Sequence, residues 1–329
     1  MTSKGRVKRA IDFQTPDRLP MEFSAFGVCD TAWLGWNQIG TGDNSLHKTY
    51  DEWGCMWQRS DVKNMGQVTG HPLSEWDNLK TYKFPDPNDP AFFTGMEERS
   101  QDLGDKYVLT SIFMVLFERL HSLRGFENLL ADLYEEPEKF MDLSDRVVEF
   151  DTTMIRNIKK RFPDCIDGIS FSDDWGTERA SIIGKDLFDK FFKPRYKIIF
   201  DECRAAGWDV WLHSCGKVTA LVPSLLDVGV KVLNLQQPRV LDIEAFGKQF
   251  AGKVCLSTCC DIQHTLPSKS NREIAEEAKL LLKCWSTPQG GFILSDYGDP
   301  QAIGVREDAK RAMFDAFVEN DPYRGNSCL

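Results

Sequence analysis

The 329-residue chain lacks the features that mark several common classes of protein. No apolar run reaches the length of a membrane span, so we expect no membrane-spanning segment. No basic cluster offsets the formal net charge of −10, which argues against binding to nucleic acid. The stretch from Met1 to Arg9 is basic but no apolar run follows it, which predicts an amphipathic helix rather than a signal peptide.

Disulfide and cofactor patterns are missing as well. The ten cysteines have no regular spacing, so they do not indicate a disulfide framework, and a reducing cytoplasm is expected. No strand-like segment is followed by Gly-x-Gly-x-x-Gly, and no Walker-type phosphate loop occurs, which disfavours a nucleotide-binding enzyme. The Asp-x-His-x-x-Gly motif typical of corrinoid-binding domains is also absent, so a non-catalytic corrinoid carrier ranks below an enzyme.

What the chain does contain is a regular alternation of strand-like and helix-like segments. Expected strands cover 167–172, 208–213, 230–235, 253–258 and 291–296, and expected helices cover 184–206, 218–228, 241–250, 271–285 and 305–320. This alternation predicts a parallel sheet with crossover helices. Further strands near residues 20, 55 and 108 raise the count to eight, which favours an α/β fold of the (β/α)8 TIM-barrel type. Extra N-terminal helices, including one over 90–103, and a hairpin complete one domain over 1–329.

The segment His213-Ser-Cys-Gly216 ends one of the expected strands. Strand side chains alternate with period two, so His213 and Cys215 point to the same side. An imidazole and a thiolate placed in this way can supply half of a tetrahedral zinc site. The alternative is that both side chains are simply buried.

Other expected strand ends carry candidate groups, because barrel enzymes place their active sites there. Asp173 and Asp174 can form a general acid/base pair or cap a helix. Cys259-Cys260 can supply a thiolate ligand or hold one buried and one idle thiol, and Tyr297 can orient a substrate or close the barrel mouth. Loop tryptophans can line an aromatic pocket or pack in the core; they are Trp33, Trp36, Trp53, Trp57 and Trp175.

A family resemblance covers most of the chain. It is carried by Arg6 to Pro20, Asp51-Glu-Trp-Gly54, His71-Pro-Leu73, Phe84-Pro-Asp86, Asp174-Trp-Gly-Thr177, His213-Ser-Cys-Gly216, Gln236-Gln-Pro238, Asp261-Ile-Gln263 and Gly290-Gly-Phe-Ile-Leu294. With these segments the chain resembles the uroporphyrinogen decarboxylase superfamily, in its branch of corrinoid-dependent methyltransferases. The resemblance implies an α/β barrel, in agreement with the strand count.

The resemblance also limits the substrate and the metal ligands. Uroporphyrinogen decarboxylases grip porphyrinogen carboxylates with an Arg-Gln-Ala-Gly-Arg segment, whereas residues 21–27 here contain no arginine. The methyltransferase branch holds zinc with a His-x-Cys and a distant Cys. His213 and Cys215 match, but the expected loop around residues 295–298 has no cysteine. Candidates for the remaining ligands are Cys260, Glu178, Asp174 and Asp296, and a site without metal is the alternative.

By resemblance, the protein would demethylate a small donor and methylate Co(I) of a separate corrinoid protein, in the one-carbon metabolism of an anaerobe. The donor could be methanol, a methylamine, a methylthiol or, favoured by the aromatic-rich loops, an aryl methyl ether. Zinc or a carboxylic acid would stabilise the leaving group. The expected catalytic residues are Asp174, His213, Asp296 and Tyr297; the substrate-binding residues are Phe26, Trp175, Gln236 and Gln237; the metal ligands are His213, Cys215, Cys260 and Glu178. A metal-free decarboxylase or lyase acting on a smaller acid is the alternative.

Overall fold

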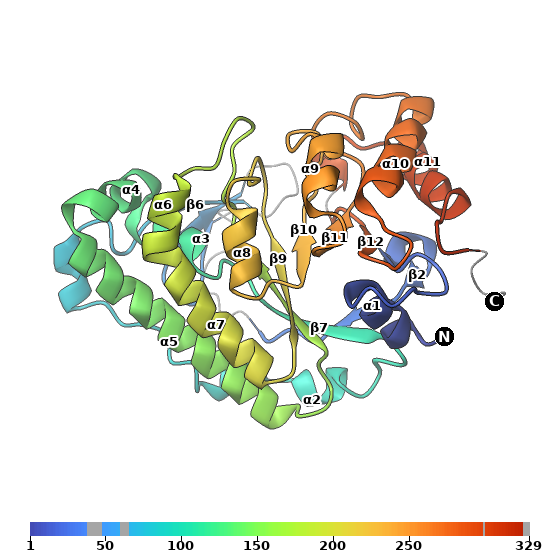
Figure 1. The fold of residues 1–329 in the computed structure, drawn as a ribbon. Coiled ribbons are helices and arrows are strands. Elements are labelled where there is room, and N and C mark those ends of the chain that lie inside the picture. Colours follow the sequence, from blue (N-terminus) through green and yellow to red (C-terminus); the bar gives the residue numbers. More distant parts are fainter. Residues whose placement is uncertain (38–47, 60–65, 299, 325–329) are drawn as a thin grey trace.

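The computed structural model describes residues 1–37, 48–59, 66–298 and 300–324 (Figure 1). One sheet runs in the order β2 (Val28–Cys29), β1 (Met21–Phe23), β12 (Phe292–Ser295), β11 (Cys255–Thr258), β10 (Val232–Asn234), β9 (Asp209–His213), β8 (Gly168–Ser172), β7 (Tyr107–Ile112) and β3 (Thr31–Trp33). Every neighbouring pair is parallel except β1 and β2. The sheet is therefore a nearly closed TIM barrel, which confirms the expected fold class.

The seam of the barrel is bridged at Asp30, between β2 and β3. Its amide donates to the carbonyl of Met21 at 2.7 Å, and its carbonyl accepts from the amide of Tyr107 at 2.9 Å. The Asp30 carboxylate is buried and accepts hydrogen bonds from Arg6 and Arg18. These bonds hold the two edges of the sheet together.

Helices surround the strands (Figure 1). They are α1 (Ser3–Ile11), α2 (Met96–Arg99), α3 (Phe117–Arg124), α4 (Phe126–Glu135), α5 (Pro137–Arg161), α6 (Lys185–Leu187), α7 (Lys193–Ala205), α8 (Val222–Asp227), α9 (Ile243–Phe250), α10 (Asn271–Trp285) and α11 (Glu307–Glu319). Figure 1 shows α5 and α7 side by side on one flank, with α10 and α11 packed together on the other. Within the described residues, no helix has both the length and the apolar character that a membrane crossing requires.

Helix α1 closes the N-terminal end of the barrel. Its apolar residues pack against the first inward-facing side chains of the strands in a separate buried cluster. The members are Val7, Ala10, Ile11, Tyr107, Leu109, Trp211, Val232, Cys255 and Ile293. Because this end is packed with apolar groups, a site can open only at the C-terminal ends of the strands, as is usual for this fold.

Two expectations about the N-terminal half were wrong. The strand near residue 55, Met56–Gln58 (β5), lies outside the barrel in a small antiparallel sheet with β4 (Lys48–Tyr50) and β6 (Gln67–Gly70). The strand that pairs with β7 in the barrel is instead Thr31–Trp33. It has only three residues, so the alternation of its side chains is a weak signal in the sequence. The expected helix over 90–103 is broken at Gly95, whose φ of 74° leaves a short turn over Pro90–Phe93 before α2. The small sheet agrees with the expected N-terminal hairpin.

Candidate metal centre

A band of polar side chains lines the open end of the barrel. The buried cluster that packs against α1, called the α1-facing cluster below, includes one inward-facing residue on each of five strands: Leu109, Trp211, Val232, Cys255 and Ile293. Because side chains alternate along a strand, the residue two places after each of these five also faces inward. On five strands that residue is Ser111, His213, Asn234, Ser257 or Ser295. Their neighbours on the outer face are apolar and buried, as at Leu212 and Leu233. Barrels of this class are usually filled by branched apolar side chains, so the polar band marks the end that holds a site.

Three potential metal ligands converge at this end. Ligand atoms of Asp174, His213 and Cys215 all lie within 4.8 Å of one another. The Cys215 sulfur is 3.4 Å from His213 Nε2, and Asp174 Oδ1 is 3.6 Å from the same nitrogen. Asp174 Oδ1 also accepts the Cys215 amide hydrogen at 2.7 Å. The convergence of His213 and Cys215 agrees with the sequence-based expectation, and Asp174, one of the candidates for the remaining ligands, lies with them.

Asn234 orients the His213 ring. Asn234 Oδ1 lies 2.7 Å from His213 Nδ1, and its amide nitrogen points to the Ser257 and Ser295 hydroxyls at 3.0 Å and 3.4 Å. With the amide hydrogens directed to the serines, the oxygen is free to accept, so Nδ1 carries the proton. The lone pair of Nε2 is then directed toward Cys215 and Asp174. Fixing one ring nitrogen so that the other can bind is typical of histidine metal ligands.

Two glycines bring the loops after β8 and β9 into contact. Gly216 has φ of 75°, and a Cβ added there would lie 2.3 Å from the carbonyl carbon and oxygen of Gly176. In turn, a Cβ on Gly176 would lie 2.4 Å from the Lys217 amide nitrogen. This close backbone approach needs glycine on both sides. It places Asp174 on one loop beside Cys215 on the other.

Gln237 and Trp175, expected to bind substrate, lie behind the site. Gln237 is buried, and its side-chain oxygen accepts the Gly216 amide hydrogen at 2.6 Å, so it holds the turn that carries Cys215. Trp175 is fully buried, stacks on Phe117 at 4.3 Å and donates Nε1–H to Tyr196 at 2.8 Å. Both side chains are occupied within the protein and support the loops. These contacts position the loops, and the expected contact of both residues with substrate stays a prediction.

The neighbouring carboxylates of Asp173 and Asp174 have separate roles. Asp173 is buried and accepts the amide hydrogens of Phe117 and Glu118 at 2.8 Å and 2.6 Å, so it caps α3. The Tyr196 hydroxyl also donates to it. Burial raises the pKa of Asp173 from 3.8 to about 7, against the opposing effect of these hydrogen bonds. Asp174 alone of the two faces His213 and Cys215.

Sequence reasoning missed Glu118, the second residue of α3. Its carboxylate accepts a hydrogen bond from the Ser172 hydroxyl at 2.9 Å. Burial raises the pKa of Glu118 well above its usual value, and the nearby carboxylates of Asp174 and Asp173 raise it further. The available signal was its place in the segment after the strand 107–112, where barrel enzymes carry functional groups.

Cys260 and Glu178, two expected metal ligands, do not join the group. Cys260 is buried and its thiol donates to the carbonyl of Ile274 on α10 at 3.5 Å. Glu178 is exposed and its carboxylate lies 3.8 Å from Nε2 of His264. Both side chains are directed to other partners, so among the described residues the ligand group consists of Asp174, His213 and Cys215.

The remaining expected residues lie near the ends of β12 and β1. Asp296 forms an ion pair with Lys310 at 2.6 Å, and burial raises the pKa of its carboxyl group. Gln236 donates to the Asp296 backbone carbonyl at 3.2 Å. Tyr297 is half-buried against the main core, and Phe26 packs against the rings of Phe23 and Phe314. The structure does not bring these four residues into the ligand group.

The donor set of the site suits zinc. Zinc binds imidazole nitrogen, thiolate sulfur and carboxylate oxygen, and a catalytic site supplies three protein ligands and leaves one position for substrate. Burial, and next the charge of Asp174, raise the pKa of the Cys215 thiol. A nearby divalent cation would offset this effect, because metal binding favours the thiolate.

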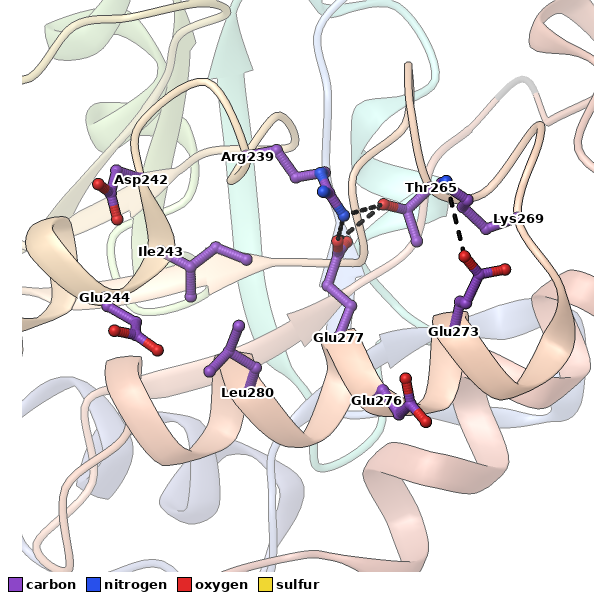
Figure 2. A pocket seen from close by; sticks show the side chains of 10 residues that line it. All are labelled: Arg239, Asp242, Ile243, Glu244, Thr265, Lys269, Glu273, Glu276, Glu277 and Leu280. Carbon is purple, nitrogen blue, oxygen red and sulfur yellow. Dashed lines mark hydrogen bonds and ion pairs between the residues drawn. The ribbon is translucent and has the colours of Figure 1, made fainter.

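A separate groove of about 640 Å³ lies outside the barrel, between α9 and α10 (Figure 2). Arg239 spans it and donates to buried Glu277 at 2.9 Å, and Thr265 donates to the same carboxylate at 2.7 Å. None of the expected site residues lines this groove. Its contacts hold the loop after β11.

Similarity to known proteins identifies the family of the chain. The model of the uroporphyrinogen decarboxylase (URO-D) family matches residues 62–317. The chain belongs to this family. A methyltransferase from Methanosarcina mazei has the same fold, with a TM-score of 0.69 at 15% sequence identity, over 97% of this chain and 99% of that one.

More distant structures include an endo-β-1,4-xylanase from Gloeophyllum trabeum. Its TM-score is 0.45 at 11% identity, over 92% of this chain and 96% of that one, which is too low to bear on function. No curated protein matches the sequence.

Proposed function

We propose that this URO-D family member is a methyltransferase that moves a methyl group from a small donor to Co(I) of a separate corrinoid protein. The observation that carries the proposal is the convergence of Asp174, His213 and Cys215 at the open end of the barrel. The fold shared with the Methanosarcina mazei methyltransferase supports it. The corrinoid protein is a partner and second substrate, and it would approach at the same open end.

The reaction requires a leaving group to depart with the electron pair of its bond to the methyl carbon. Co(I) supplies the pair for the new carbon–cobalt bond, and the leaving group takes up one proton. Zinc held by His213 Nε2, the Cys215 sulfur and Asp174 would act as a Lewis acid on the leaving atom. The protein's own part is to hold the ligands in place, through Asn234 on His213 and Gln237 on the Cys215 turn. Burial, and next the charge of Asp174, raise the pKa of Glu118, which favours the protonated form of its carboxyl group.

The metal content of the purified protein tests this proposal. We expect near-stoichiometric zinc in the native protein, measured by elemental mass spectrometry, and its loss in His213→Ala and Cys215→Ala. The matched controls are His264→Ala and Cys165→Ala, which change the same residue types outside the ligand group. The controls should keep zinc and should keep methyl transfer to Co(I) corrinoid. Native protein that holds no zinc after reconstitution, or unchanged turnover in His213→Ala, would overturn the metal mechanism.

A second candidate is a metal-free decarboxylase or lyase acting on a small acid. It is favoured by the raised pKa of Glu118, since a protonated carboxyl group can deliver a proton to a carbanion. Carbon dioxide release from small carboxylic acids by metal-free protein is the measurement that would favour it over methyl transfer.

A further inference from the structure

Glu22 is an acidic side chain inside the barrel that the proposed reaction does not use. Its neighbours on β1, Met21 and Phe23, are at most 1% exposed and belong to the outer core, so Glu22 faces the interior. The register pairs it with Ser295, whose hydroxyl is bonded to Asn234. In the sheet order, β1 is four strands from β9, which carries His213. Glu22 and the metal ligands therefore stand on opposite walls of the barrel.

Among the described residues, the Glu22 carboxylate has one hydrogen bond and no cationic partner. The Thr31 hydroxyl donates to it at 3.1 Å across the seam of the barrel. Burial raises the pKa of Glu22 from 4.5 to about 7, and among the described residues no lysine, arginine or histidine opposes that effect. A buried carboxylate is normally paired. By contrast, Asp296 at the same end of the barrel has Lys310 as its partner.

Trp33 lies on β3, the strand that carries Thr31, the hydrogen-bond partner of Glu22, and it is exposed. It follows Thr31 by two residues on β3 and is in register with Leu109 of the α1-facing cluster, so it shares the inner face. Although it faces the interior, 52% of its surface is accessible. A hollow of about 540 Å³ lies at the end of β7, lined by Trp36, Asn37, Ser111 and Phe113. An exposed indole on the inner face, and a carboxylate that has no cationic partner among the described residues, offer the two attractions that a cationic nitrogen needs.

We propose that Glu22 and Trp33 bind a positively charged nitrogen of the methyl donor, at the end opposite its reacting methyl group. This inference rests on the proposed methyltransferase function and names its substrate class: a small ammonium compound that also carries an O-methyl or S-methyl group. The nitrogen contacts one wall, and the methyl-bearing oxygen or sulfur faces Asp174, His213 and Cys215 on the other. Such a donor replaces the neutral aryl methyl ether that the aromatic loops suggested.

Binding calorimetry on the zinc-reconstituted full chain tests the assignment. The probe is methoxyethylammonium, and neutral dimethoxyethane of similar shape is its reference. We expect the cation to bind native protein more tightly than the neutral ether. Glu22→Gln should weaken cation binding about tenfold or more, because a charge-assisted contact is lost. Trp33→Leu should weaken it roughly threefold, as for an exposed cation–π contact.

Glu276→Gln is the matched control, because Glu276 lies on the outer groove and outside the barrel. It should leave both affinities unchanged. Equal binding of the two probes by native protein, or unchanged cation affinity in both Glu22→Gln and Trp33→Leu, would overturn the proposal. Trp33→Leu changes an accessible side chain and so keeps the test decisive if Glu22→Gln fails to fold.

Zinc content is measured on the same samples, which separates the two proposals. Zinc-loaded protein without preference for the cation would refute the substrate class and leave the methyltransferase intact. A Glu22-dependent cation preference in protein that binds no zinc would support the binding site and refute the metal mechanism.

Discussion

Replacing Gly216 by alanine should disturb both stability and the metal centre. At φ of 75°, an alanine adopts the left-handed region at a cost of about 1–2 kcal/mol. Its Cβ would also lie 2.3 Å from the Gly176 carbonyl group, where ordinary contact begins near 3.4 Å, so the two loops must separate by about 1 Å. Overpacking of this kind costs about 1–3 kcal/mol. The expected loss is therefore about 2–5 kcal/mol.

The same displacement moves Cys215 away from Asp174, since each lies within two residues of one of the glycines. Zinc affinity should fall by about 10- to 100-fold, as when the groups that support a metal ligand are changed. Differential scanning calorimetry measures the first effect, with a Tm lower by about 3–7 °C. Competition with a chromophoric chelator measures the second.

Two further substitutions separate the cost of the positive φ from the steric effect of the added Cβ. Gly176→Ala introduces the steric contact without the positive φ, so its effect should be smaller than that of Gly216→Ala but of the same kind. Gly184→Ala is the control, because Gly184 has φ of −68° and no atom within 4 Å of an added Cβ. If Gly216→Ala matched Gly184→Ala in both Tm and zinc affinity, the reasoning about the two loops would be refuted.

Two other predictions concern single polar side chains. Asn234→Ala should weaken zinc binding about 10- to 100-fold in the chelator assay while Asn234→Asp retains it, and equal affinities would contradict the role of Asn234 in orienting His213. Burial raises the pKa of Glu22 from 4.5 to about 7 in the folded protein. Between these two pH values the folded state binds more protons than the unfolded state, so the free energy of unfolding falls as the pH rises through this range. Glu22→Gln should remove up to about 3 kcal/mol of that decline, measured by urea unfolding at about pH 5 and about pH 8, and an unchanged pH dependence would contradict burial of the carboxylate.

The C-terminal half of the fold could be predicted from the sequence because each of its elements is long and has a clear period. The segments expected at 208–213 and 271–285 match β9 and α10 within a residue. Thr31–Trp33 could not be found in this way, since three residues give too short a period and Trp33 is exposed like a loop residue. Met56–Gln58 was recognised as a strand, but nothing local shows which sheet a strand joins.

The site was predictable where its chemistry lies within one segment. His213 and Cys215 are two residues apart, so strand geometry alone brought them together. Asp174 was named as a candidate, but its approach depends on the contact of Gly176 with Gly216, 40 residues away in the chain. Trp175 follows an expected strand, as an accessible loop residue would, but in the structure it stacks on Phe117 and is buried. Contacts between distant segments decide these cases.

The division of the barrel into two layers accounts for how a stable core and an open site coexist. The layer nearest α1 is apolar and fully packed, so the barrel does not need its upper interior for hydrophobic stabilisation. The outer faces of the same strands supply the main core against the helices. The upper interior can then carry small hydroxyl side chains, which leave space for a ligand. Ser172 donates a hydrogen bond to Glu118, and Ser257 accepts one from Asn234. Because a carboxylate in this space is costly without a cation, the upper interior favours positive charge near each wall, from a cationic ligand group beside Glu22 and from a metal ion beside Asp174.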